Sequence, residues 1–253
     1  MNPVKVGFFS MTGGALSGDD DAYLAWHALD HLPEQYSIPG IRLGTRWRAD
    51  DACVAGRAAE REDLAPIRHA VGYFMGDPVE TTLRSFAQLG RRCAETGRYP
   101  EPATSFLLGA FHFQHAAAAP RVLVSPEAVP FRPHRGVYLI VEEPVEGGDL
   151  DGWLRWQHQE HGPSLLAVEG VAGVYGFRAS TLLGTGADQG ERFAVPMWNP
   201  RGRLITVVYL DDDVVATSAR LDPLVRARWA TGAIEGVLAG PFRSMVTNLA
   251  WPE

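Results

Sequence analysis

Residues 26–33 read Trp-His-Ala-Leu-Asp-His-Leu-Pro, and residues 156–163 read Trp-Gln-His-Gln-Glu-His-Gly-Pro. The first tryptophan, the histidine five positions after it and the proline two positions later coincide when the chain is shifted by 130 residues. At that shift residues 7–49 lie over 137–179 without a gap, and ten pairs are identical: Gly18/Gly148, Asp19/Asp149, Asp21/Asp151, Leu24/Leu154, Trp26/Trp156, His31/His161, Pro33/Pro163, Gly40/Gly170, Arg48/Arg178 and Ala49/Ala179. Such an ungapped series predicts two copies of one unit.

The internal similarity continues further along the chain at a slightly larger shift. Moving residues 73–94 by 136 positions places them over 209–230 and pairs Tyr73 with Tyr209. The increase in the shift predicts a loop that is six residues longer in the second copy, within 180–203.

Both copies show the same order of predicted elements. Runs rich in β-branched and aromatic residues predict strands, and longer segments that follow acidic or turn residues predict helices. The expected strands are 4–11, 41–49, 70–75 and 106–115 in the first copy and 136–142, 171–179, 204–210 and 242–249 in the second. The expected helices are 20–36, 78–96, 150–167 and 213–231. The order is βαββαβ, the ferredoxin-like unit.

We therefore predict an α+β fold built from two ferredoxin-like βαββαβ units, at 1–120 and 134–253, joined by a linker at 121–133. Such a unit carries both helices on one face of its four-stranded sheet and leaves the other face bare. Packing the two bare faces against each other buries their apolar surface within one chain.

Composition limits the classes of function. The 253 residues carry a net charge of -7 and no cluster of lysine and arginine, which argues against binding to nucleic acid or to an anionic membrane. No apolar run approaches the length of a membrane span. Two cysteines without a CxxC spacing suggest neither a disulfide framework nor a zinc knuckle, and the N-terminus lacks the pattern of a secretion signal. We expect a cytoplasmic protein.

The segment Trp26 to Pro33, followed by Pro39-Gly40, resembles the first-helix signature of EthD-like members of the dimeric α+β barrel superfamily. In the second copy, Glu169 replaces the proline before Gly170. The resemblance implies an intramolecular version of a barrel that most relatives form by dimerisation, and it leaves a further homodimer open. It also implies a wide choice of activities, including cofactor-free monooxygenases, cyclases, isomerases and heme enzymes such as chlorite dismutase.

Two histidines on the first helix are the leading catalytic candidates. His27 and His31 share a helix face with Leu24, which indicates that this face lies toward the sheet. His161 occupies the equivalent place in the second copy, where Gln157 replaces His27. An imidazole between helix and sheet can act as general acid or base. The alternative is a buried histidine with a structural role.

Further polar and aromatic residues recur in both copies. Arg48 and Arg178 end the second strand and could hold a substrate carboxylate, with a surface or packing role as the alternative. Tyr73 could donate a hydrogen bond to an enolate and Tyr209 could contact substrate, but both also suit a packed core. Trp26 is assigned to the wall of the substrate site or to helix packing.

The histidines could also serve as ligands of a metal or cofactor. His27 and His31 have the spacing that can bind a metal from one helix, but His69, His112 and His115 supply no third ligand at a compelling spacing. We predict neither a metal nor a cofactor.

The leading hypothesis is a cofactor-independent enzyme of the isomerase, lyase or hydrolase type. It would act on a small aromatic-catabolic or polyketide-like molecule through histidine acid–base chemistry. A heme- or metal-dependent oxidoreductase and a non-catalytic binding module are the alternatives. The fuller motif suggests that the first copy keeps the active site, against the alternative of two working sites.

Overall fold

The computed structural model describes residues 3–14, 20–99, 104–179 and 202–245. The first half contains β1 (Val6–Thr12), α1 (Asp20–Trp26), a π-helical turn (His27–His31), α2 (Leu32–Tyr36), β2 (Ile41–Arg48), α3 (Asp51–Ala55), β3 (Ala59–Glu60), β4 (His69–Met75), α4 (Val79–Glu95) and β5 (Ser105–Ala118). After a 3-10 helix (Pro126–Phe131), the second half contains β6 (Gly136–Pro144), α5 (Leu150–Trp156), a second π-helical turn (Gln157–His161), α6 (Gly162–Leu166), β7 (Val171–Ala179), β8 (Leu204–Leu210), α8 (Val214–Trp229) and β9 (Ile234–Ser244).

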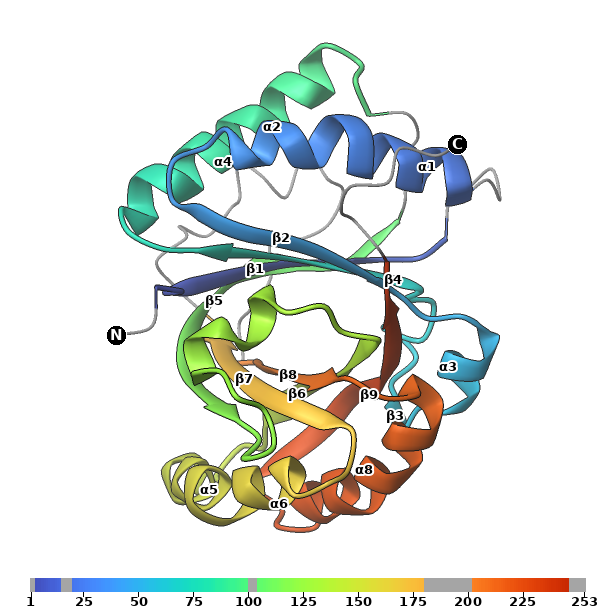
Figure 1. Cartoon of the computed structure of the whole chain (residues 1–253), viewed down its shortest axis with the longest axis vertical. Coiled ribbons are helices and arrows are strands. Elements are labelled where there is room, and N and C mark those ends of the chain that lie inside the picture. The colour runs from blue at the N-terminus through green and yellow to red at the C-terminus, as the bar shows by residue number, and fades with distance from the viewer. Residues whose placement is uncertain (1–2, 15–19, 100–103, 180–201, 246–253) are drawn as a thin grey trace.

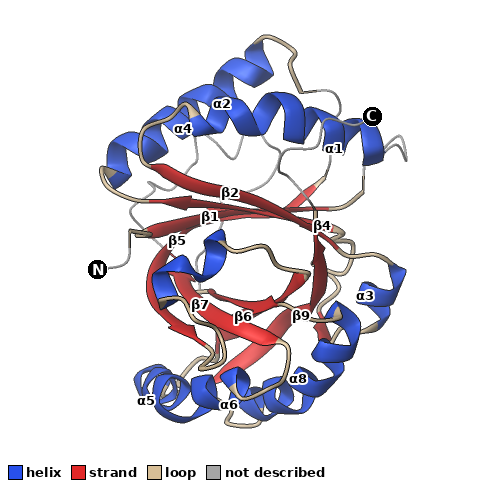
Figure 2. Ribbon diagram, in the orientation of Figure 1, coloured by secondary structure: helices blue, strands red, loops and turns tan. Residues whose placement is uncertain are grey.

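The strands close into an eight-stranded antiparallel barrel. The first half is ordered β2-β4-β1-β5 and the second β7-β8-β6-β9, the same arrangement in each. β5 pairs with β7 and β2 pairs with β9, so the halves join along both edges and not only face to face. Helices α1, α2 and α4 cover one outer side of the barrel, and α5, α6 and α8 cover the opposite side (Figures 1 and 2).

The interior of the barrel is an apolar core to which both halves contribute. Phe74 of the first half stacks on Phe177 of the second, with ring centroids 5.6 Å apart and planes at 11°. Phe9 meets the same Phe177 edge-on at 5.2 Å. Burial of such large rings is the main favourable contribution to a closed sheet of this kind.

The last strand departs from the prediction. β9 runs over Ile234–Ser244, whereas the sequence suggested 242–249, and residues 246–249 lie outside the described part of the chain. The small strand β3 was also not predicted. It pairs with β9, placing Ala59 opposite Ala239, and so carries a segment of the first half across to the second.

The expected pairing of Tyr73 with Tyr209 is wrong by one residue. Phe8 faces Tyr73 on β4, and its counterpart Tyr138 faces Val208 on β8. The third strands therefore correspond at a shift of 135, and the helices that follow agree, because Val79 and Val214 each begin one. A slip of one residue turns a side chain to the other face of a strand.

The first helix of each half contains a π-helical turn that the sequence pattern did not reveal. In the first half the Leu32 amide donates to the carbonyl of His27, five residues earlier. Pro33 follows directly, and it can neither donate to the carbonyl four residues before it nor sit close to that carbonyl. A widened turn accommodates both restrictions. His161-Gly162-Pro163 repeats the arrangement in the second half.

The segment expected as a linker is packed against the barrel. Its 3-10 helix buries Val129 in the interior core. The Tyr175 hydroxyl on β7 donates to the Pro126 carbonyl at 3.1 Å. No helix among the described residues is long and apolar enough to cross a membrane.

Candidate functional site

Three of the predicted residues meet between the first helix and the sheet of the first half. The π-helical turn directs His27 and His31 toward the sheet, and both are buried. Tyr73 on β4 contacts His27 from the sheet, and its hydroxyl oxygen lies 2.9 Å from Nε2 of His27. The two imidazole rings are 5.8 Å apart. π-Helical turns occur often at functional sites because they reposition side chains locally.

His31 is held by two neighbours on the same helix. Its Nε2 lies 2.9 Å from the side-chain amide nitrogen of Gln35, so the amide donates to it. The Trp26 indole stacks on the imidazole at 4.7 Å with an angle of 17°. Tyr99, which follows α4, closes this aromatic group at 5.7 Å from His31. Trp26 thus packs against the histidine cluster, and its predicted role as a wall of a substrate site stays a prediction.

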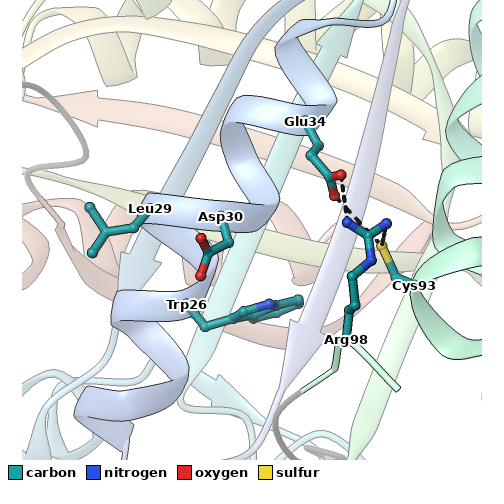
Figure 3. Close-up of a pocket in the computed structure, with 6 residues that line it drawn as sticks. All are labelled: Trp26, Leu29, Asp30, Glu34, Cys93 and Arg98. Atoms are coloured by element: carbon teal, nitrogen blue, oxygen red, sulfur yellow. Dashed lines mark hydrogen bonds and ion pairs between the residues drawn. The ribbon is translucent and has the colours of Figure 1, made fainter. Parts of the chain in front are cut away.

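An open pocket of about 400 Å³ lies on the outer side of this wall (Figure 3). Its lining residues are Trp26, Leu29, Asp30, Glu34, Cys93 and Arg98. The pocket does not include the buried pair of His27 and Tyr73. Trp26 belongs to both regions, because its indole lines the pocket and stacks on His31.

Burial determines the protonation states in the cluster. It lowers the pKa of His27 well below its usual value, with smaller contributions from the charge of Arg46 and from His31. Burial also lowers the pKa of His31 to about 4, opposed by Glu34 and assisted by Arg98 and Arg46. The pKa of Tyr73 is raised, again mainly by burial. At neutral pH the imidazoles are therefore neutral and the phenol is protonated.

Arg46 is a site residue that the sequence interpretation missed. It lies on β2, two residues before Arg48, and its side chain faces the helices with only 2% exposed. The guanidinium lies over the Tyr23 ring, 4.7 Å from the ring centre. All three of its nitrogens are buried without a hydrogen-bond partner among the described residues.

The two arginines that were predicted to bind substrate lie elsewhere. Arg48 has 43% of its side chain exposed and forms an ion pair of 3.5 Å with Asp20, which also bonds His69 at 3.1 Å. Arg178 lies on β7 opposite His112 of β5. Within the described residues, no hydrogen bond or ion pair links either arginine to the histidine cluster. Their assignment to substrate binding is therefore not supported by the geometry.

Tyr209 is on the wrong side of the sheet for its predicted role. Its side chain belongs to the apolar core inside the barrel, where it meets Tyr175 edge-on at 5.9 Å. The reason is the one-residue difference in register described above. Val208 takes the position toward the helices that Tyr73 holds in the first half.

The second half keeps one part of the arrangement and loses the rest. His161 stacks on Trp156 at 4.9 Å and 21°, as His31 does on Trp26. Burial, assisted by the charge of Arg228, lowers the pKa of His161 to about 3. Gln157 and Val208 stand in place of the hydrogen-bonded histidine and tyrosine. Among the described residues, His161 therefore has neither a second imidazole on its own helix face nor a phenol at the place of Tyr73.

Arg228, a buried arginine of the second half, pairs two of its three nitrogens with a carboxylate, while its Nη1 has no hydrogen-bond partner among the described residues. Arg228 on α8 places its guanidinium 5.0 Å from the Trp153 ring centre, at the position equivalent to Tyr23. Glu142 on β6 accepts from Arg228 Nε at 3.0 Å and from Nη2 at 2.6 Å. The same carboxylate accepts from the indole nitrogen of Trp229 at 2.9 Å. Charge is therefore balanced at this side of the barrel.

One group of residues has the proximity that a metal ion needs. Ligand atoms of His31, Glu34 and Cys93 lie within 4.8 Å of one another. Arg98 already donates to Glu34 at 2.6 Å and approaches the Cys93 sulfur at 3.4 Å, as Figure 3 shows. Burial also raises the pKa of the Cys93 thiol, which opposes the thiolate that binds metals. A cation would have to displace an arginine here.

The described residues of the second half are closely packed, which does not favour a heme there. The buried Nε2 of His161 has no hydrogen-bond partner among the described residues, which suits an axial ligand. Side chains pack closely in this half, however. The His115 ring lies over Gly176 so closely that a Cβ there would be 2.2 Å from it. Trp153 and Arg228 are both buried, with the guanidinium over the indole.

Comparisons with known proteins agree on the fold. No family model matches the chain, and no curated protein matches it. An anthrone oxidase-like protein aligns with a TM-score of 0.57 and 10% identity, over 95% of this chain and 91% of its own. A protein provisionally assigned as a chlorite dismutase aligns with a TM-score of 0.57 and 13% identity, over 96% of each chain. A provisionally assigned monooxygenase from Fusobacterium nucleatum aligns with a TM-score of 0.51 and 9% identity, over 96% of this chain and 94% of its own. At these identities the similarity concerns the fold, and the chain has the fold of the dimeric α+β barrel proteins.

Proposed function

We propose that the first half holds the active site of an enzyme that transforms a small, partly aromatic molecule by proton transfer. The observation that carries this proposal is the buried hydrogen bond of 2.9 Å between His27 and Tyr73, next to the neutral imidazole of His31. Titratable groups that converge in a water-poor site and have displaced pKa values are typical of acid–base catalysts.

Each residue has a role that its geometry permits. His31 accepts a proton from the substrate and later returns it. A histidine with a pKa near 4 is a weak base, so it suits a substrate whose proton is already acidic, such as an enolisable ketone or a phenol. Tyr73 stays protonated and donates a hydrogen bond to the oxygen on which charge develops. His27 orients that phenol, and Trp26 forms the wall facing the pocket.

The reaction that follows proton removal decides between two classes of enzyme. Return of the proton to another atom gives the cofactor-independent isomerase, and loss of a leaving group gives the lyase. Cleavage of an ester by water through an enol-stabilised intermediate, with release of the alcohol, gives the hydrolase. The solved structures with this fold include an anthrone oxidase-like protein and a provisionally assigned monooxygenase, which favours an oxidoreductase as the alternative. A carbanion or phenolate formed beside His31 is also the electron-rich species that a reaction with dioxygen requires.

We further propose that the chain is a tandem duplication of an EthD-like unit in which only the first copy retains the site. The identical strand order of the two halves and the Trp–His stack in each support a common origin. The replacement of His27 by Gln157 and of Tyr73 by Val208 supports the loss of function in the second copy. A cytoplasmic location, assembly into a homodimer and the absence of nucleic-acid and membrane partners stay predictions.

Exchange of carbon-bound protons tests the proposal without knowledge of the natural substrate. Anthrone is a suitable probe because its methylene protons are activated by a carbonyl, and their replacement in deuterium oxide is followed by NMR. We expect the protein to accelerate this exchange. His27→Gln, which copies the second half, and Tyr73→Phe should each reduce the acceleration by roughly 100-fold or more.

Four outcomes would contradict the proposal or favour an alternative. No acceleration by the unmodified protein, or full acceleration by both variants, would remove acid–base catalysis from this site. Exchange accompanied by oxygen uptake and formation of anthraquinone would assign the protein to the oxidoreductase class. A heme absorption band in the purified protein would instead support the cofactor-dependent alternative.

A further inference from the structure

The charge of Arg46 is the feature of the first half that the proposed acid–base chemistry leaves unexplained. An arginine side chain stays protonated in proteins, so this guanidinium brings a full positive charge into the helix–sheet interface. A buried charge without a counter-ion is strongly unfavourable. Arg46 is 2% exposed, and none of its three nitrogens has a hydrogen-bond partner among the described residues.

The second half shows how the same fold neutralises such a charge. There Arg228 lies over an aromatic ring, as Arg46 does, but the buried carboxylate of Glu142 accepts two of its hydrogen bonds. Thr12 occupies the position of Glu142 in the first half. Asp20, an acid at the start of α1, is bound by His69 and Arg48. The first half therefore has the cation without the corresponding carboxylate.

We propose that Arg46 binds the oxyanion of a small aromatic substrate, either a carboxylate or an enolate or phenolate. This names the substrate class of the active site proposed above and rests on that proposal. A guanidinium offers parallel N–H donors that match a carboxylate or a single charged oxygen. Tyr23, whose ring lies over the guanidinium, is only half-buried, so it reaches from Arg46 to the surface.

The position of Arg46 also connects anion binding with the histidines. After burial, the charge of Arg46 is among the causes that lower the pKa of His27 and of His31, and it acts on Tyr73 as well. An anion on Arg46 offsets that charge and so raises the pKa of both imidazoles, while the larger effect of burial remains. Substrate binding would then activate the site that it occupies.

Benzoate and benzamide form a matched pair of probes, since they differ mainly in charge. We expect benzoate to raise the melting temperature of the protein saturably by several degrees in a chloride-free buffer, and benzamide to leave it unchanged. Arg46→Met should abolish the benzoate shift. Arg48→Met, at the exposed arginine two residues later, should retain it. 4-Nitrophenolate tests the phenolate form, and binding of either anion through Arg46 supports the proposal.

Stability without ligand provides a second readout with opposite signs for the two arginines. Arg46→Met removes an unpaired charge and should raise the melting temperature, whereas Arg228→Met leaves Glu142 unpaired and should lower it. A fall for Arg46→Met as large as that for Arg228→Met would show an internal counter-ion and overturn the proposal. Failure of both anions to bind, or equal binding of benzamide, would also overturn it.

The outcome for the anion site can be separated from that for catalysis. His27→Gln keeps Arg46 and should keep the benzoate shift while losing proton exchange. Anion binding through Arg46 with normal exchange in His27→Gln would refute the acid–base proposal and leave the anion site standing. Proton exchange that depends on His27, without anion binding through Arg46, would refute the anion site and leave the acid–base proposal standing.

Discussion

Replacing Glu142 by alanine should destabilise the second half strongly, because its carboxylate neutralises the buried guanidinium of Arg228. Glu142 and Arg228 are both fully buried, and the carboxylate accepts from two nitrogens of Arg228 and from the Trp229 indole. Breaking a buried pair from one side costs about 3–5 kcal/mol. For a chain of this size that corresponds to a fall in melting temperature of about 6–20 °C.

Urea denaturation followed by tryptophan fluorescence measures this loss, with two controls. Glu235→Ala removes an exposed carboxylate 3.8 Å from Arg61 and should change the free energy of unfolding by less than about 1 kcal/mol. The double variant Glu142→Ala/Arg228→Met removes both charges and should recover much of the loss. A loss below about 1 kcal/mol for Glu142→Ala, or no recovery in the double variant, would refute the reasoning that these two charges compensate each other.

Three further predictions concern pH, packing and access. The pKa of His161 falls to about 3 on folding, so the unfolded chain binds more protons below the usual histidine pKa of 6.5, and stability should fall as pH drops from 6.5 toward 3. His161→Gln should lower the number of protons taken up on unfolding in this pH range by up to one. An unchanged slope of stability against pH would contradict the low pKa of His161. Gly40→Ala should unfold at clearly lower urea than Gly97→Ala, because both glycines have positive φ but only a Cβ at Gly40 meets a side-chain oxygen, that of Thr82. Equal midpoints would remove the steric argument. Trp26→Ala should raise the pKa of His31 from about 4 in an NMR titration, since burial is the main cause of its low value; no rise would show that the indole does not shield the imidazole.

The fold was largely predictable where the repeat has no gaps. The segment from the first strand to the second carries a Trp–His–Pro pattern and a Pro-Gly or Glu-Gly turn. These residues align the two halves of the sequence at a single shift of 130 positions. The bounds expected for β7 and β8 agree with the structure, and those for β2 and β4 differ by one residue at one end.

The register of the third strand was not predictable by the same means. Both β4 and β8 are buried along their whole length, because one face lies against the barrel core and the other against the helices. Such strands have no alternation of polar and apolar residues to fix the register. The identity of Tyr73 and Tyr209 therefore selected an alignment that is one residue off, and it placed Tyr209 in the wrong environment.

The candidate site was partly predictable for a similar reason. His27, His31 and Trp26 were found because helical spacing determines which residues share a face. Arg46 and Arg48 share one face of β2, so spacing alone does not distinguish them, and Arg48 was chosen because the second copy repeats it. The difference arises from the packing of α1, which covers Arg46 with Tyr23 and leaves Arg48 partly exposed.

The central claim is that one half of a structurally repeated barrel performs the chemistry. Rates of anthrone proton exchange for His31→Ala and His161→Ala, each compared with the unmodified protein, test it most directly. We predict a loss of roughly 100-fold or more for His31→Ala and a rate within about twofold of the unmodified protein for His161→Ala, with both variants folded by circular dichroism. Equal losses in the two variants would contradict the claim.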